Sequence, residues 1–162
     1  MKKITPLFKG LITGLAMLTV TILLSYTRQD PSAGSVYLVY GLYAAGIFWT
    51  LWDYSRTEKY SATFGSIFGQ GFRCFIVVTL IMVIFTGIYS MTHPELAEAS
   101  TQLYKAELVK KGNMLPAAVE KEANDYKTHF TTSFISTAIF GYLVIGVFFT
   151  AAGAGFLLLR RK

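Results

Sequence analysis

The ionisable residues separate the chain into four long stretches that carry no charge. Three of them, residues 10–27, 31–52 and 74–94, are each close to the length of one bilayer crossing. A helix rises about 1.5 Å per residue, so a hydrocarbon core of about 30 Å needs about 20 apolar residues. The fourth stretch, residues 128–159, begins with polar residues and enters the membrane near Phe134. The pattern predicts four transmembrane helices at about 8–27, 34–54, 70–91 and 132–159.

The predicted spans are apolar on every side. The run from Phe75 to Tyr89 has no polar face, whereas a core helix of a soluble bundle keeps one. The first stretch could instead be the apolar region of a signal peptide. Residues 26–30 offer no small-x-small cleavage site, so we expect an uncleaved first helix. The fold class is therefore all-α membrane protein, with residues 1–162 forming one integral membrane domain.

A longer polar segment, at about residues 93–131, lies between the third and fourth spans. Apolar residues recur there at helical spacing after His93 and Pro94, at Leu96, Ala99, Leu103 and Ala106. Glu107 precedes Lys111 by four residues, the favourable order for an ion pair on a helix. The sequence predicts a helix over this part.

The same segment contains a second predicted helix. Gly112 is placed to stop the first helix, and Pro116 is placed in the first turn of the next. The following apolar residues keep a 4-3-4 spacing that runs without a breaker into the fourth span: Val119, Ala123, Tyr126 and Phe130. We therefore expect a helical hairpin outside the membrane. It is either a docking surface or lid, or a passive connector that lies on the headgroups.

Composition and charge indicate how the predicted helices are oriented in the membrane. The 162 residues are 53% hydrophobic with 15 Lys and Arg against 9 Asp and Glu, and the mean hydropathy is +0.47. These values exclude a disordered or disulfide-rich secreted chain. The termini and the loop between the second and third spans hold nine basic and two acidic residues, a net charge of +7. The opposite side holds six basic and seven acidic residues, a net charge of −1.

Basic segments remain on the cytoplasmic side of a membrane. Both termini are therefore expected in the cytoplasm, with the chain in a bacterial inner membrane. The basic ends face anionic lipid headgroups, which explains the net charge of +6 without a nucleic-acid partner. The lipid bilayer is the first expected partner.

The stretch TFGSIFGQGFR at residues 63–73 is followed by an apolar run to Ile88 and Tyr89, and then by His93, Pro94 and Glu95. This order resembles the uncharacterised membrane-protein family known as domain of unknown function 4199. The resemblance extends over nearly the whole chain. It implies a four-helix inner-membrane protein of Bacteroidota with no assigned activity and no catalytic residues to transfer.

Several residues at the cytoplasmic membrane boundary are candidates for structural roles. Gly65, Gly69 and Gly71 lie where the chain enters the third span, and the first two have small-xxx-small spacing. They can serve packing within the chain, a dimer interface or a ligand contact. Asp53 and Arg73 stand at the ends of the second and third spans, where they can pair as a structural anchor rather than as part of an ion path.

Catalytic chemistry has little support in the sequence. No ionisable residue lies deep in a span, and His93 and His129 lack metal-binding spacing. Cys74 is the only cysteine, and Trp49 and Trp52 fit an interfacial aromatic belt. We therefore expect no enzyme activity, no cofactor and no metal.

We expect a non-enzymatic accessory or interaction component that binds a membrane-protein partner or a second copy of itself. The alternatives are a small transporter or channel subunit, and an enzyme acting on lipid-linked substrates outside the membrane. The enzyme would need His93, His129 and Glu95 to converge within hydrogen-bond reach.

Overall fold

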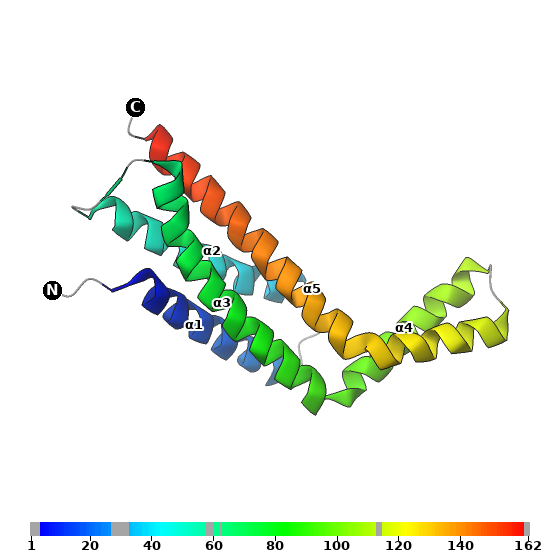
Figure 1. Ribbon diagram of the computed structural model, residues 1–162. Helices are drawn as coiled ribbons and strands as arrows, with labels where there is room; N and C mark the ends of the chain where they lie inside the picture. Colours follow the sequence, from blue (N-terminus) through cyan, green and yellow to red (C-terminus); the bar gives the residue numbers. More distant parts are fainter. Residues whose placement is uncertain (1–3, 27–32, 58–59, 62, 113–114, 161–162) are drawn as a thin grey trace. The chain divides into compact units, whose positions relative to one another are not determined.

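The computed structural model describes residues 4–26, 33–57, 60–61, 63–112 and 115–160. Over these residues the chain forms five α-helices and no strand (Figure 1). They are α1 (Pro6–Tyr26), α2 (Ala33–Ser55), α3 (Phe64–Thr92), α4 (Pro94–Lys111) and α5 (Pro116–Leu159). The expected all-α class is confirmed.

Three helices in the described part of the chain are long and apolar enough to cross a bilayer, namely α1, α3 and α5. Their exposed side chains include Leu15, Ile84 and Phe148. Large apolar side chains in such numbers on a helix surface are typical of contact with lipid. The second predicted span falls on α2, which is not among the three, so the count of four spans stays a prediction.

The chain divides into two compact units. Unit 1 comprises Met1–Met82 and Ile139–Lys162, and unit 2 comprises Val83–Ala138. Both α3 and α5 contribute residues to each unit.

In unit 1, α1 and α3 lie side by side and run in the same direction. Gly10 lies against Cys74, where an added Cβ would come within 2.5 Å of the carbonyl oxygen. Further along both helices, Gly14 lies against Ile81. The absence of a side chain at each glycine lets the two helices approach closely.

In the same unit, α5 lies beside α2 and runs in the same direction. Gly146 faces Tyr43, and Gly153 faces Leu51. The helix α2 also packs along α1. The centre of unit 1 is filled by apolar side chains, which include Met17, Ile47, Phe75, Val78, Met82 and Ala154.

Among the described residues of unit 1, buried hydroxyls form hydrogen bonds except that of Thr150, whose Oγ1 has no partner. The fully buried Tyr43 donates its hydroxyl proton to the Tyr142 carbonyl oxygen over 3.1 Å, and Thr79 Oγ1 lies 3.4 Å away. The hydroxyls of Thr13 and Thr50 each donate to the carbonyl four residues earlier, over 2.9 Å. Such bonds remove the cost of burying a hydroxyl among apolar groups.

In unit 2, α4 and the first part of α5 run antiparallel. Lys127 Nζ lies 2.9 Å from Glu98 Oε1, and Lys105 forms an ion pair with Glu120. Because the later residue of α4 pairs with the earlier residue of α5, the two arms lie in opposite directions.

The predicted boundary between these arms is confirmed. The helix α4 ends at Lys111, and Gly112 has the left-handed φ of 66° that glycine adopts without a Cβ clash. Its N–H donates to the Val109 carbonyl over 3.1 Å. Pro116 then begins α5, which continues without a break to Leu159, as the sequence predicted.

The two predicted apolar faces of unit 2 have different surroundings. Val119, Ala123 and Phe130 of α5 are buried, as their spacing indicated. On α4, the residues from Leu96 to Ala106 keep the predicted helical spacing, but Leu103 is 74% exposed. The α4 face therefore remains partly uncovered.

Candidate functional site

One end of unit 1, here called the basic end, gathers cationic and aromatic side chains. Lys9 near the start of α1 contacts Asp53 near the end of α2. Arg160, which follows α5, lies over the ring of Trp52 with Cζ 4.9 Å from the ring centroid. The start of α1 and the ends of α2 and α5 therefore meet at this end.

Lys9 is buried at the basic end. Its side chain is 4% exposed, forms an ion pair with Asp53 and places Nζ 5.4 Å from the centroid of the Trp49 ring. The side chain of Asp53 is 42% exposed, so water still reaches the carboxylate. A buried ammonium needs such an anion and the aromatic face to offset the loss of hydration.

The pairing of Asp53 differs from the sequence prediction. Asp53 lies at the end of α2 as expected, but its partner is Lys9 rather than Arg73. Arg73 is exposed on α3 and forms no ion pair with any residue that the structure describes. The position of Asp53 at the membrane boundary indicated that this residue forms an ion pair. Which base it pairs with depends on how the helices pack.

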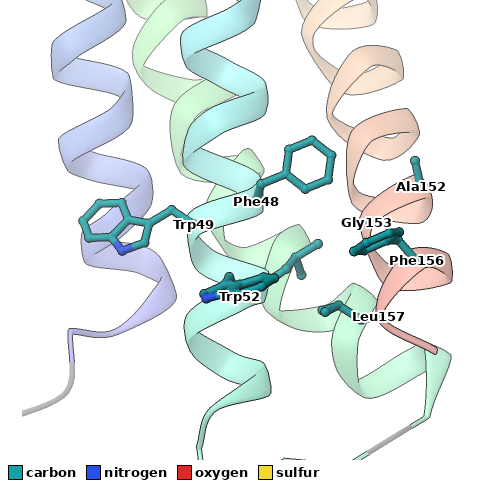
Figure 2. A pocket seen from close by; sticks show the side chains of 8 residues that line it. Phe48, Trp49, Trp52, Ala152, Gly153, Phe156 and Leu157 are labelled. Atoms are coloured by element: carbon teal, nitrogen blue, oxygen red, sulfur yellow. The ribbon is translucent and has the colours of Figure 1, made fainter. Parts of the chain in front are cut away.

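An apolar groove of about 760 Å³ opens between α2 and α5 at the basic end (Figure 2). Figure 2 shows Phe48 pointing from α2 toward α5, with Phe156 on α5 opposite it. Trp49 points toward α1, where Lys9 meets its ring. The lining of this α2–α5 groove is Phe48, Trp49, Leu51, Trp52, Ala152, Gly153, Phe156 and Leu157.

A second cavity adjoins the α2–α5 groove, and we call it the arginine pocket. Its volume is about 290 Å³, and its lining is Trp52, Ser55, Arg56, Tyr60, Leu157 and Arg160. Trp52 and Leu157 line both cavities. Arg56 Cζ lies 5.2 Å from the Trp52 ring centroid, so two guanidinium groups lie near one indole.

The three predicted glycines have different environments. A Cβ added at Gly65 or Gly69 would meet nothing within 4 Å. Gly71 lies directly against the side chain of Thr150, so α3 and α5 approach closely there. Only Gly71 of the three lies at a close helix contact within the described chain.

The two histidines have separate surroundings in unit 2. His93 stacks on Tyr89 with ring centroids 4.1 Å apart, and its Nδ1 lies 3.1 Å from the Tyr89 carbonyl. His129 lines a surface hollow of about 520 Å³ that also includes Glu122 and Asp125. No group of three or more His, Cys, Asp or Glu side chains in the described ranges is arranged to hold a metal ion.

Tyr104 joins the two arms of unit 2. Its ring stacks on Tyr126 at a centroid distance of 4.5 Å, and its hydroxyl donates to Glu122 over 3.3 Å. Loss of hydration raises the pKa of Tyr104, and the negative charge of Glu122 raises it further. The neutral phenol is therefore favoured in the folded chain.

Sequence reasoning identified the aromatic residues of the basic end but not the groove. Trp49 and Trp52 fit an interfacial belt, which needs no cavity. One signal was available, because Arg56 follows Trp52 by four residues and therefore lies on the same face near the end of α2. The local sequence of α2 did not indicate that residues of α5 form the other wall of the groove.

The comparisons with known proteins place the chain in one family. A family model described as "Protein of unknown function (DUF4199)" matches residues 9–158. The resemblance drawn from residues 63–95 is therefore confirmed. No curated protein and no solved structure matches the chain.

Proposed function

The chain belongs to the DUF4199 family of proteins of unknown function, and we propose that it is a four-span protein of the bacterial inner membrane with a non-enzymatic accessory role. Both termini are then cytoplasmic, and α4 with the first part of α5 forms a hairpin outside the membrane. The apolar length of α1, α3 and α5 supports a membrane location. The alternating helix directions in unit 1 support an even number of crossings.

The charge distribution supports this orientation. Lys9, Arg56 and Arg160 lie together at the basic end of unit 1. Segments rich in lysine and arginine remain in the cytoplasm during insertion. The basic end therefore lies at the cytoplasmic face in this proposal.

The accessory role is carried by two exposed apolar side chains of α4. Leu103 and Val109 are both largely exposed, although each lies on a helix that is fixed to α5 by ion pairs. Exposed apolar side chains on an ordered helix are available for contact with a protein partner. We propose that this part of α4 binds a membrane-protein partner or a second copy of the chain.

The centre of unit 1 favours this role over transport. Its core is mostly apolar, and the hydroxyls of Tyr43, Thr13 and Thr50 are hydrogen-bonded within the protein, which leaves the Thr150 hydroxyl as the buried one without a partner among the described residues. A solute path would need polar groups free to replace the hydration of the solute.

A photoreactive amino acid at Leu103 or Val109 in native membranes tests the accessory role. We expect crosslinks to one discrete protein at both positions. The same probe at Asn124, an exposed residue of α5, is the control and should give few crosslinks. Crosslinks to lipid alone from Leu103 and Val109 would support a passive connector instead.

A further inference from the structure

We propose that the α2–α5 groove and the arginine pocket together bind one anionic phospholipid. An acyl chain occupies the groove, and the lipid phosphate occupies the arginine pocket. The inference rests on the membrane location proposed above and does not depend on the accessory role. It assigns a ligand to the basic end of unit 1.

The groove has the chemistry of an acyl-chain site. Aromatic and aliphatic side chains from α2 and α5 form its walls, and its volume of about 760 Å³ suits a small-molecule ligand. Figure 2 shows the Phe48 ring directed from α2 toward α5 and the Phe156 ring on α5. An acyl chain is the apolar ligand that a bilayer supplies at every exposed helix surface.

The arginine pocket supplies the complementary charge. Arg56 and Arg160 both lie against Trp52, and neither forms an ion pair within the part of the chain that the structure describes. Asp53 lies close by in sequence, but its carboxylate pairs with Lys9. Guanidinium groups bind phosphate through paired N–H donors, and both arginines line this pocket.

The groove and the arginine pocket lie next to each other, as the acyl chain and the headgroup of a lipid do. Trp52 and Leu157 line both, so an apolar chain in one continues directly to a headgroup in the other. The indole of tryptophan favours the boundary between hydrocarbon and headgroup. Trp52 therefore marks the depth at which the glycerol backbone of the lipid lies.

Native mass spectrometry of the detergent-purified full chain tests the proposal. Binding of dioleoylphosphatidylglycerol is compared with that of dioleoylphosphatidylcholine, which has the same acyl chains and no net charge. We expect the anionic lipid to bind about tenfold more tightly. Glycerol phosphate, which has no acyl chain, should not displace it.

Two pairs of variants separate the headgroup from the chain. R56Q/R160Q should lower the affinity for phosphatidylglycerol about tenfold, whereas R73Q removes an exposed arginine outside the site and should leave it unchanged. A152F fills the groove from an exposed position, and V144F adds the same ring elsewhere on α5. We expect weaker binding in A152F only. R56K/R160K keeps the charge and should retain part of the affinity.

Circular dichroism and gel filtration establish that each variant is folded, and single R56Q and R160Q variants replace the double one if it is not. If R73Q and R56Q/R160Q lowered the affinity for phosphatidylglycerol equally, binding would depend on the overall positive charge and not on this site, which would overturn the proposal. Equal affinity for both lipids, or displacement by glycerol phosphate, would also overturn it. Because the assay contains no protein partner, a failed crosslink at α4 does not change its result.

Discussion

Lys9 and Asp53 form an ion pair that joins the start of α1 to the end of α2 across 44 positions of sequence. The ammonium is buried beside the Trp49 ring, while the carboxylate is partly exposed. Water can solvate the Asp53 carboxylate but not the Lys9 ammonium. Loss of the ion pair would therefore cost more at the lysine than at the aspartate.

Replacing Asp53 by asparagine should therefore destabilise unit 1. The buried Lys9 ammonium would lose its anion, at a cost of about 1–3 kcal/mol. The free energy of unfolding in mixed micelles measures this change. R73Q, an exposed charge removal on α3, should cost less than about 0.5 kcal/mol. Equal stability of D53N and R73Q would show that the ion pair does not stabilise the fold.

Gly146 should be intolerant of a side chain. An alanine Cβ there would lie 2.8 Å from the Phe75 ring, in the packed centre of unit 1. Overpacking of this kind costs about 1–3 kcal/mol, which thermal unfolding of G146A in detergent would detect. Gly69 is the matched control, because an added Cβ meets nothing within 4 Å. A G69A protein that unfolds as early as G146A would contradict the packing described.

Tyr104 should ionise at a higher pH than an ordinary tyrosine, because burial and the Glu122 charge raise its pKa. The stability that the neutral phenol contributes is fully present below the ordinary pKa of about 10 and is lost as the pH rises through the raised value. The difference between the ultraviolet titrations of the wild type and Y104F isolates this group.

Two variants check the cause of the Tyr104 shift. E122Q removes the neighbouring charge, so the Tyr104 midpoint should fall toward the ordinary value. E120Q removes a charge that pairs with Lys105 and should leave the midpoint in place. An unchanged midpoint in E122Q would assign the shift to burial only.

The proposed orientation predicts which positions an impermeant maleimide reaches in intact spheroplasts. Gln102→Cys on α4 should be labelled from outside, and Ser61→Cys, between α2 and α3, only after lysis. The native Cys74 is buried, so the wild-type protein provides the unlabelled background. Labelling of Ser61→Cys before lysis would require a different orientation or span count.

The sequence determined the helices and the apolar character of those long enough to cross a bilayer. A bilayer crossing requires an apolar run of about 20 residues, so this character can be read position by position. The boundary at Gly112 and Pro116 was equally local, because a left-handed glycine and a proline each act within one turn. The unbroken course of α5 followed from the lack of a breaker after Pro116.

The tertiary structure decided which side chains meet. A helix that is apolar on all sides has no polar face to indicate its packing surface, so the sequence did not distinguish Gly71, which contacts Thr150, from Gly69, which meets nothing within 4 Å. The partner of Asp53 and the groove between α2 and α5 depend on helices that are distant in sequence. Their contacts arise from the fit of side chains between helices, which no single helix contains.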